Sequence, residues 1–347
     1  MGRDARAAGS LSNAGYSSRM NRRTGAAALT AAVMSLTACG AAITLPAIPS
    51  APVTTTNTAA PSTGSVTPSA SAKSTDGSMR QGLPDEVVDR LTLSRAFVQV
   101  AEVKGLHYRI SSRVVAVGNT TDTVLQKVTD TADESVPRIE ALTGQHAKDK
   151  YLVLAAADDS TAQKWTGDSN VADADGITMP YGKAAWIVIP TGHHFTDGMR
   201  IIDDDDYFTH VMDHEVFHAD TLPVDFDDPS VPEWMVEGYA EWAANQEVST
   251  GPEKEPPARL PSDKEVVDDT DDGYFRAGMF VQYVADRFGT SKALAFYRAM
   301  LVATHDSLAV EFQRATGADY KATVTAWQHQ FKEQFRSFDP DWQWVSD

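Results

Sequence analysis

Two histidines four residues apart constrain this chain more than any other feature of its sequence. His214 and His218 enclose Glu215 in the order His-Glu-Val-Phe-His. On a helix, residues four apart lie on one face, so both imidazoles can reach a single metal ion. Glu215 projects beside that face, where it can accept a proton from a water on the metal. The segment therefore predicts a helix that supplies one side of a metal site.

A second predicted helix supplies a third ligand, Glu237. Ser230-Val231-Pro232-Glu233 fits a capping box, and proline is tolerated in the first turn of a helix. The connection from Ala219 to Pro229 is short, so the two helices can lie side by side. Two His and one Glu would leave one coordination position open, which is typical of catalytic rather than structural zinc.

The motif is too specific to be explained well by chance. The chain holds 9 His in 347 residues, and His-Glu-x-x-His is then expected on the order of 0.01 times. Asp203–Asp206 precede the motif and offer helix N-caps with negative charge near the helix start. The alternative is an ordinary amphipathic helix that exposes these side chains to solvent.

Two further residues have open roles at this stage. His210 lies one turn before His214. It could be a metal ligand, but we favour a role in lining the site without binding the metal. Glu241 shares a face with Glu237, where it can accept the N–H of one imidazole from outside the metal. A solvated carboxylate is the alternative for Glu241.

The two blocks together resemble the gluzincin zinc peptidases. The resemblance rests on His214–His218 and on Pro232–Trp242, and it is greatest to the peptidase MA-like domains related to thermolysin and the zinc aminopeptidases. It implies that His214, His218 and Glu237 bind one Zn²⁺ ion, and that Glu215 is the general base. It also implies that Glu241 orients the first histidine.

The chain departs from neighbouring families at defined positions. Thr221 and Val224 stand where metzincins have Gly and His. Gly176–Pro180 does not fit the Gly-x-Met-x-Asn block of the aminopeptidases, so the sequence gives no support for recognition of a free N-terminus. The resemblance therefore indicates the reaction and leaves open whether the protein is an endopeptidase or an exopeptidase.

A peptidase of this kind also needs a donor for the oxyanion besides zinc. The resemblance implies a Tyr or a His, and none stands at the family's spacing. The candidates in the sequence are Tyr274, Tyr283, His193 and His194, and we rank Tyr274 first.

The N-terminus predicts export and a lipid anchor. Arg22 and Arg23 precede a run of small and apolar residues that ends in Leu-Thr-Ala before Cys39, the only cysteine. Residues 1–38 resemble a bacterial lipoprotein signal peptide, which implies cleavage before Cys39 and its lipidation. The alternative is an ordinary secretory signal and a secreted protein. Residues 39–82, rich in Ala, Pro, Ser and Thr, predict a flexible tether.

The remaining chain predicts an α+β, zincin-like fold. We expect an N-terminal lobe (83–220) with a mixed sheet and the metal helix, a mainly helical lobe (221–347) with the third ligand, and an active-site cleft between them. The expected strands are 107–117, 150–156 and 183–190, and the expected helices outside the two motif helices are 86–104, 122–142, 274–288, 291–303, 307–316 and 320–337. A polar loop is expected over 249–272. The resemblance implies that 183–190 forms the sheet edge above the zinc, where an extended peptide could add.

Charge restricts the partners. The formal net charge is −18, and loss of five Arg and one Asp with residues 1–38 makes it about −22 (−18 − 4). Such an acidic protein is unsuited to nucleic acid, and its membrane contact is expected only through Cys39. The acidic run at 268–272 lacks the calcium-loop pattern at the third and twelfth positions and is interpreted as solvated charge.

The sequence therefore predicts a zinc-dependent peptidase at the bacterial cell surface, with a peptide or protein substrate. Two alternatives remain. One is a catalytically inactive, zinc-containing lipoprotein that acts as a binding module, although structural zinc has no need of a base such as Glu215. The other is a solute-binding or adhesive lipoprotein in which the metal site is incidental.

Overall fold

The computed structural model describes residues 83–93, 96, 100, 103, 105–167, 174–179, 184–194, 198–223, 226, 228–244, 257–267, 272–302 and 304–338. The predicted signal peptide, Cys39 and the tether lie outside the described residues. So does most of the acidic run at 268–272.

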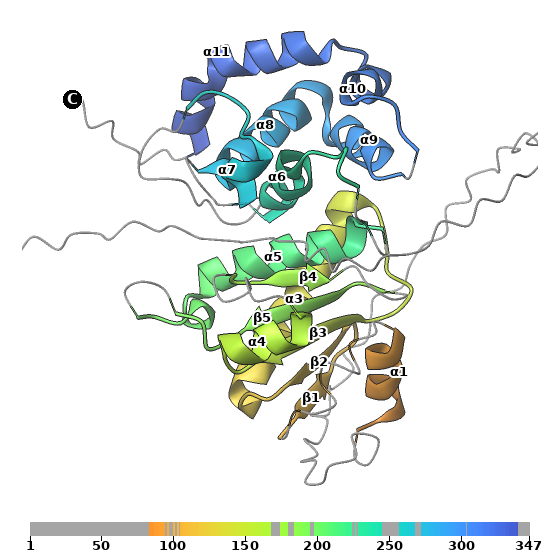
Figure 1. The fold of residues 1–347 in the computed structure, drawn as a ribbon, viewed down its shortest axis with the longest axis vertical. Coiled ribbons are helices and arrows are strands. Elements are labelled where there is room, and N and C mark those ends of the chain that lie inside the picture. The colour runs from red at the N-terminus through yellow and green to blue at the C-terminus, as the bar shows by residue number, and fades with distance from the viewer. Residues whose placement is uncertain are drawn as a thin grey trace, which may run out of the picture. The chain divides into compact units, whose positions relative to one another are not determined.

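The described chain is α+β and contains a mixed sheet of five strands (Figure 1). Across the sheet the strands follow the order β1 (His107–Ile110), β2 (Val114–Gly118), β3 (Tyr151–Ala156), β5 (Trp186–Pro190) and β4 (Ile177–Met179). β2, β3 and β5 are parallel, whereas β1 and β4 pair antiparallel with their neighbours at the two edges. β4 was not predicted.

The prediction of one strand over 107–117 was wrong, because this segment is a hairpin of β1 and β2. His107 pairs with Gly118 and Ile110 with Val115. At the turn, the backbone N–H of Ser111 donates to the carbonyl of Val114 at 2.9 Å, and the Ser111 hydroxyl accepts from the N–H of Val114 at 2.9 Å. A serine that satisfies backbone groups locally favours a turn over a continuous strand.

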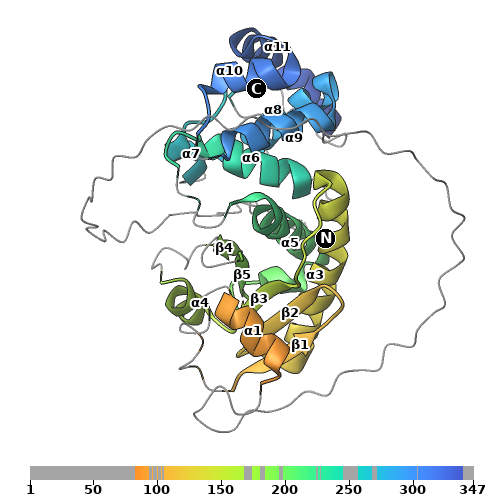
Figure 2. The same cartoon turned by 90° about the vertical axis from the view of Figure 1, so that its right-hand side faces the viewer.

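The two faces of the sheet carry different helices (Figure 2). On β2, Val114 and Ala116 belong to one buried apolar cluster, whereas Val115 and Val117 belong to another, as the two-residue period of a strand requires. The first cluster includes residues of α3 (Asp122–Thr143) and α5 (Asp205–Thr221). The second includes residues of α1 (Asp85–Leu93) and α4 (Asp159–Thr166). Both faces are covered, as expected for parallel strands.

Local signals define the start of α5. The short 3₁₀ helix η2 (Ile201–Asp203) precedes it, and the side chain of the N-cap residue Asp204 accepts the backbone N–H of Tyr207 at 3.0 Å. Asp205 and Asp206 place negative charge in the first turn, near the positive end of the helix dipole. The predicted N-cap is therefore confirmed. The buried residues of α5 extend from Tyr207 to His218, so the helix is enclosed along most of its length.

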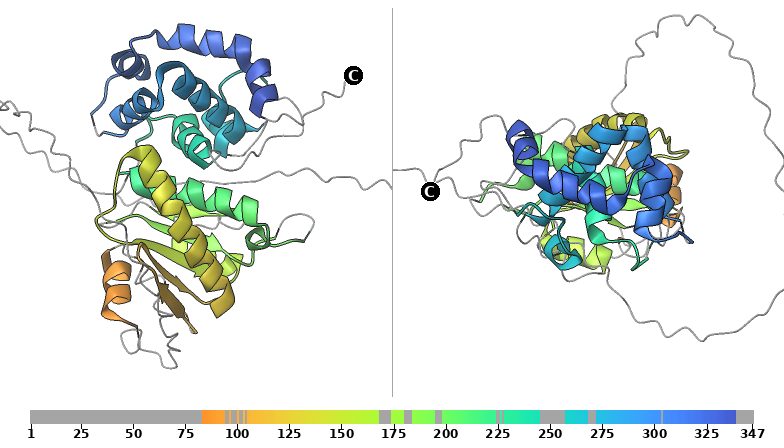
Figure 3. Two further views of the ribbon diagram at one scale, coloured as in Figure 1. Left: turned by 180° about the vertical axis from the view of Figure 1, so that it is seen from behind. Right: turned by 90° about the horizontal axis from the view of Figure 1, so that it is seen from above.

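The remaining helices follow α5 in the chain. They are α6 (Glu233–Ala244), α7 (Asp263–Val267), α8 (Gly273–Phe288), α9 (Thr290–Met300), α10 (Leu308–Thr316) and α11 (Tyr320–Phe338). Their bounds lie within a few residues of the helices predicted after residue 273. The described part of the predicted loop 249–272 contains α7, which that prediction missed. α6 lies between α5 and the outer helices α10 and α11 (Figure 3).

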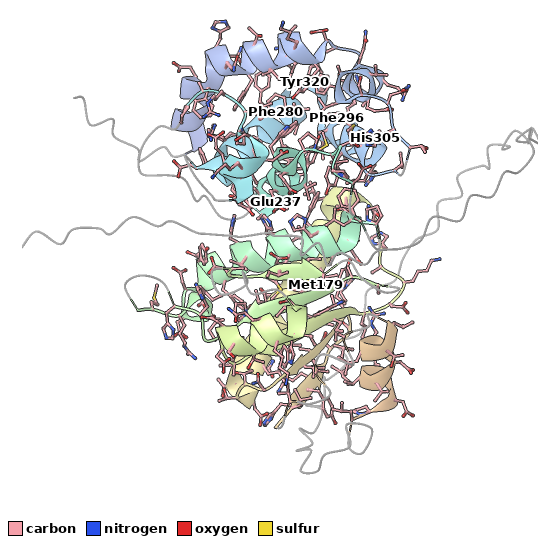
Figure 4. The ribbon with its side chains drawn as sticks, viewed as in Figure 1. Met179, Glu237, Phe280, Phe296, His305 and Tyr320 are labelled. Carbon is pink, nitrogen blue, oxygen red and sulfur yellow. The ribbon has the colours of Figure 1, made fainter. Side chains whose placement is uncertain are left out.

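Aromatic residues fill the space among these helices. Phe280 of α8 makes edge-to-face contacts with Trp234 and Trp327, at ring-centroid distances of 5.4 and 5.3 Å. Phe280, Phe296 and Tyr320 are labelled in Figure 4. The same buried cluster continues through Phe217 of α5 to the sheet, so the segments predicted as two lobes share one apolar core.

α6 and α8 approach closely because small residues line their contact. A Cβ added at Gly238 would lie 2.8 Å from the Ala277 Cβ, and one added at Gly278 would lie 2.9 Å from the Glu241 Cγ. Both distances are too short for a real side chain. Glycine at these two positions therefore lets α6 and α8 pack closely against each other.

Candidate metal centre

Two imidazoles on α5 form the first half of the site. His214 and His218 stand one turn apart, and their Nε2 atoms are 3.0 Å from each other. The ring centroids are 4.7 Å apart with the planes at 72°. Each residue is 1% exposed. Helical periodicity alone places them on one face, as the motif predicts.

Glu237 of α6 completes the cluster from the opposite side. Its Oε2 lies 3.1 Å from His214 Nε2 and 3.2 Å from His218 Nε2. Figure 4 labels Glu237 where α6 faces α5. Three buried donor atoms thus lie close together. Within the described residues, His214, His218 and Glu237 form a group of side chains whose ligand atoms are close enough to hold one ion.

The donor atoms fit a zinc ion in type and spacing. Two imidazole nitrogens and one carboxylate oxygen are a known set for catalytic zinc, with metal–ligand distances of about 2.0–2.2 Å. Tetrahedral ligands at that distance stand about 3.4 Å from each other. The distances of 3.0–3.2 Å observed among the three atoms are close to this value.

The charge around the cluster also favours a cation. Burial lowers the pKa of His214, but hydrogen bonds with Glu237 and Glu241, and the charges of Glu237 and Glu215, raise it to about 10. The carboxylates therefore stabilise positive charge at this ring. A buried group of carboxylates requires a compensating cation, and a metal ion can supply it.

Glu241 and His210 form a pair outside the three donor atoms. Glu241 Oε2 lies 3.2 Å from His210 Nε2 and 3.6 Å from His214 Nδ1, so its stronger contact is with His210. Burial raises the pKa of Glu241, but His210 and His214 hold it well below its usual range. His210 contacts the carboxylate of Glu241 and is not among the three donor atoms. This position agrees with a residue that lines the site without binding the metal. Glu241 is buried rather than solvated.

Glu215 contacts the edge strand of the sheet. The hydroxyl of Thr178, on β4, lies 2.6 Å from Glu215 Oε2 and 2.9 Å from the Glu215 backbone carbonyl. Glu215 and Thr178 are both buried. The sequence identified Glu215 and missed Thr178, because a contact between residues 37 positions apart leaves no local pattern.

The four candidates for an oxyanion donor occupy different places. Tyr274, in the first turn of α8, has its ring centroid 6.0 Å from that of His214. Tyr283 lies nine residues further along α8, about 13 Å at 1.5 Å per residue, and accepts a hydrogen bond from Arg287. His193 contacts Asp159 and Asp175, and His194 forms an isolated bridge with Arg200. Of the four candidates, Tyr274 is the one whose ring lies beside that of a predicted ligand, His214.

The strand at the sheet edge near the candidate metal centre is not the one that was predicted. Residues 183–190 were expected at the edge, but β5 (Trp186–Pro190) lies inside the sheet between β3 and β4. The edge strand is β4, which contacts α5 through Thr178. The continuous apolar run of residues 184–189 is typical of an interior strand and could have indicated this position.

Comparison with known protein families and with curated proteins returns no match. Among the helices of the described residues, none combines the length and hydrophobicity needed to span a bilayer.

Proposed function

We propose that this protein is a zinc-dependent peptidase with a zincin-like fold. The observation that carries the proposal is the convergence of His214 Nε2, His218 Nε2 and Glu237 Oε2 from two helices, with Glu215 next to the first ligand. The mixed sheet with an antiparallel edge strand beside α5 is compatible with such a fold. We further propose that the substrate lies in a cleft between the sheet and the helical part.

In this mechanism His214, His218 and Glu237 would hold the ion. A zinc ion bound there would act as a Lewis acid and would lower the pKa of a water molecule. Glu215 accepts a proton from the attacking water and passes it to the leaving amine, so that one carboxylate serves as base and then as acid. Tyr274 donates to the developing oxyanion. Glu241, supported by His210, holds the imidazole of His214 in place.

The substrate is proposed to bind along β4. One side of this strand pairs with β5, and within the described residues no strand pairs with its other side, which could accept an extended peptide through main-chain hydrogen bonds. The strand carries Thr178, which contacts Glu215, so a peptide added there would run past the base. β4 thus replaces residues 183–190 in the binding mode that the sequence suggested.

The location proposed for this peptidase is the outer face of a bacterial membrane. The support is the sequence of residues 1–38 and the position of Cys39, which would carry the lipid. The tether of residues 39–82 would place the peptidase away from the membrane surface.

The experiment combines elemental analysis with cleavage of a peptide library. The purified protein should contain one zinc per chain and cleave peptides, and a chelator should abolish cleavage. Glu215→Gln should keep zinc but lower the rate by about 10²–10⁴-fold, because the base is lost while the ligands stay. Full activity of that variant would remove Glu215 from the mechanism.

One observation favours a second function. His214, His218 and Glu237 are each 1% exposed, which also suits a zinc site that stabilises a binding module without hydrolysis. In that case the protein would contain zinc, and no peptide in the library would be cleaved with or without the chelator.

A further inference from the structure

Thr178 makes a contact with Glu215 that the other residues of β4 do not share. Along β4, the side chains of Ile177 and Met179 pack against the apolar cluster on the α1 and α4 side of the sheet. Thr178 points to the opposite face, as the alternation of a strand requires, and there its hydroxyl contacts Glu215. Figure 4 labels Met179 on this strand.

The hydroxyl of Thr178 is well suited to hold a carboxylate. It carries one proton and lies within hydrogen-bond distance of Glu215 Oε2 (2.6 Å) and of the Glu215 carbonyl (2.9 Å). The carboxylate is the stronger acceptor because it is charged. The last torsion of a Glu side chain has broad preferences, so a buried donor to one oxygen selects one rotation of the carboxylate.

Gly176 lets the strand come this close. A Cβ at position 176 would lie 2.8 Å from Glu215 Cγ and 3.0 Å from a methyl carbon of Val211. Any larger residue would push the side chain of Glu215 away from the strand. The absence of a side chain at position 176 leaves room for Glu215 Cγ, while the hydroxyl of Thr178 contacts its carboxylate.

A second hydrogen bond fixes the same segment to the start of α5. The Tyr207 hydroxyl donates to Asp175 Oδ2 at 2.5 Å, and both residues are buried. From Tyr207 to Glu215 the helix rises about 12 Å, and from Asp175 to Thr178 an extended chain covers about 10 Å. The segment can thus run alongside α5, attached at both ends.

We propose that Thr178 is a positioning residue for the general base. Its hydroxyl holds one carboxylate oxygen of Glu215 and sets the rotation in which Glu215 meets the attacking water. Because Thr178 belongs to the strand proposed to bind the substrate, a peptide that orders β4 also orders the base. This inference rests on the proposed peptidase function, in which Glu215 is the base.

The experiment compares Thr178→Val with Thr178→Ser in the full-length protein loaded with zinc. Valine keeps the shape and removes the hydroxyl, whereas serine keeps the hydroxyl. With a fluorogenic peptide that the parent protein cleaves, Thr178→Val should lower kcat by about 10- to 100-fold while KM changes by less than about threefold. Thr178→Ser should restore most of kcat. Zinc content should be unchanged in both variants, because within the described residues the Thr178 hydroxyl contacts Glu215 and none of the three candidate ligands.

Thr191→Val is the matched control. Thr191 is also buried in this sheet region, and its hydroxyl donates to the carbonyl of Ala156 at 2.8 Å. The variant loses a comparable hydrogen bond away from Glu215 and should keep kcat. If Thr178→Val is insoluble, Thr178→Ala removes the same hydroxyl, and the same loss of kcat is expected.

A measurement without zinc or substrate tests the contact separately. In excess chelator, Tm is measured for Thr178→Val, Glu215→Ala and the double variant. The decrease in Tm of the double variant should be smaller than the sum of the two single decreases, because both substitutions remove the same interaction. Additive losses, full kcat in Thr178→Val, or no recovery in Thr178→Ser would each overturn the proposal for Thr178. A zinc-loaded parent protein that cleaves no peptide would instead overturn the peptidase function, and the Tm comparison would still decide the contact.

Discussion

Removal of His210 tests whether contacts outside the three candidate metal ligands stabilise the site. The imidazole of His210 lies 3.2 Å from Glu241 Oε2, and the same oxygen lies 3.6 Å from His214 Nδ1. All three residues are buried, so water has little access to replace the lost ring. In His210→Ala, the carboxylate of Glu241 loses the closer of its two imidazole partners, which weakens its hold on His214.

The expected magnitude follows from the type of contact. Loss of a partner that orients a metal ligand typically weakens metal affinity 10- to 100-fold, which is about 1.4–2.8 kcal/mol of binding free energy. The metal-free protein should also lose about 1–3 kcal/mol of stability, because a buried carboxylate gives up a hydrogen-bonding partner. Zinc affinity is the property that separates a role at the metal centre from a purely structural one.

The assay is competition for zinc with a chromophoric chelator, after the protein has been freed of metal. His305→Ala is the control, because His305 is also an imidazole with a mostly buried side chain beside a carboxylate, 3.4 Å from Asp228 Oδ2. The control should lose stability but keep its zinc affinity. The reasoning is refuted if His210→Ala binds zinc as tightly as the parent protein, or if both variants weaken zinc to the same extent.

Two further predictions concern pH and the anchor. In the metal-free protein, burial opposes protonation of His214, but Glu237 and Glu241 outweigh it and raise the pKa from 6.5 to about 10. The stability from this proton is fully present below pH 6.5 and is lost as the pH rises toward 10, so Tm in chelator should fall across this range; a constant Tm would contradict the assignment. Separately, labelling of bacteria with a radioactive fatty acid should mark the parent protein but not Cys39→Ala, which should leave the membrane fraction; a labelled variant would exclude Cys39 as the lipid site.

Much of the candidate centre could be predicted because its geometry is local. His214 and His218 share a face through the period of one helix, and Asp204 supplies the N-cap that starts this helix. The later helices were also predictable, since Gly289 and Gly317 end α8 and α10 with positive φ values of 92° and 82°.

The misassigned edge of the sheet shows where local pattern fails. The apolar run of residues 184–189 is typical of an interior strand, but it does not indicate which strands lie on its two sides, because strand order depends on which segments pair after the chain has folded. β4 has only three residues, too few for a periodic signal, yet it occupies the edge beside α5. The hairpin of β1 and β2 was missed for a related reason, since the two strands are short and only three residues separate them.

The sequence by itself determined the candidate ligands, because the residue types stand in the chain and the spacing of His214 and His218 follows from the period of one helix. The tertiary structure alone decided that Thr178 contacts Glu215, that His210 contacts Glu241, and that Tyr274 lies beside His214. Each of these pairs joins residues from different elements. Such contacts depend on how helices and strands pack, and packing is set by the shapes of many side chains together rather than by any short segment.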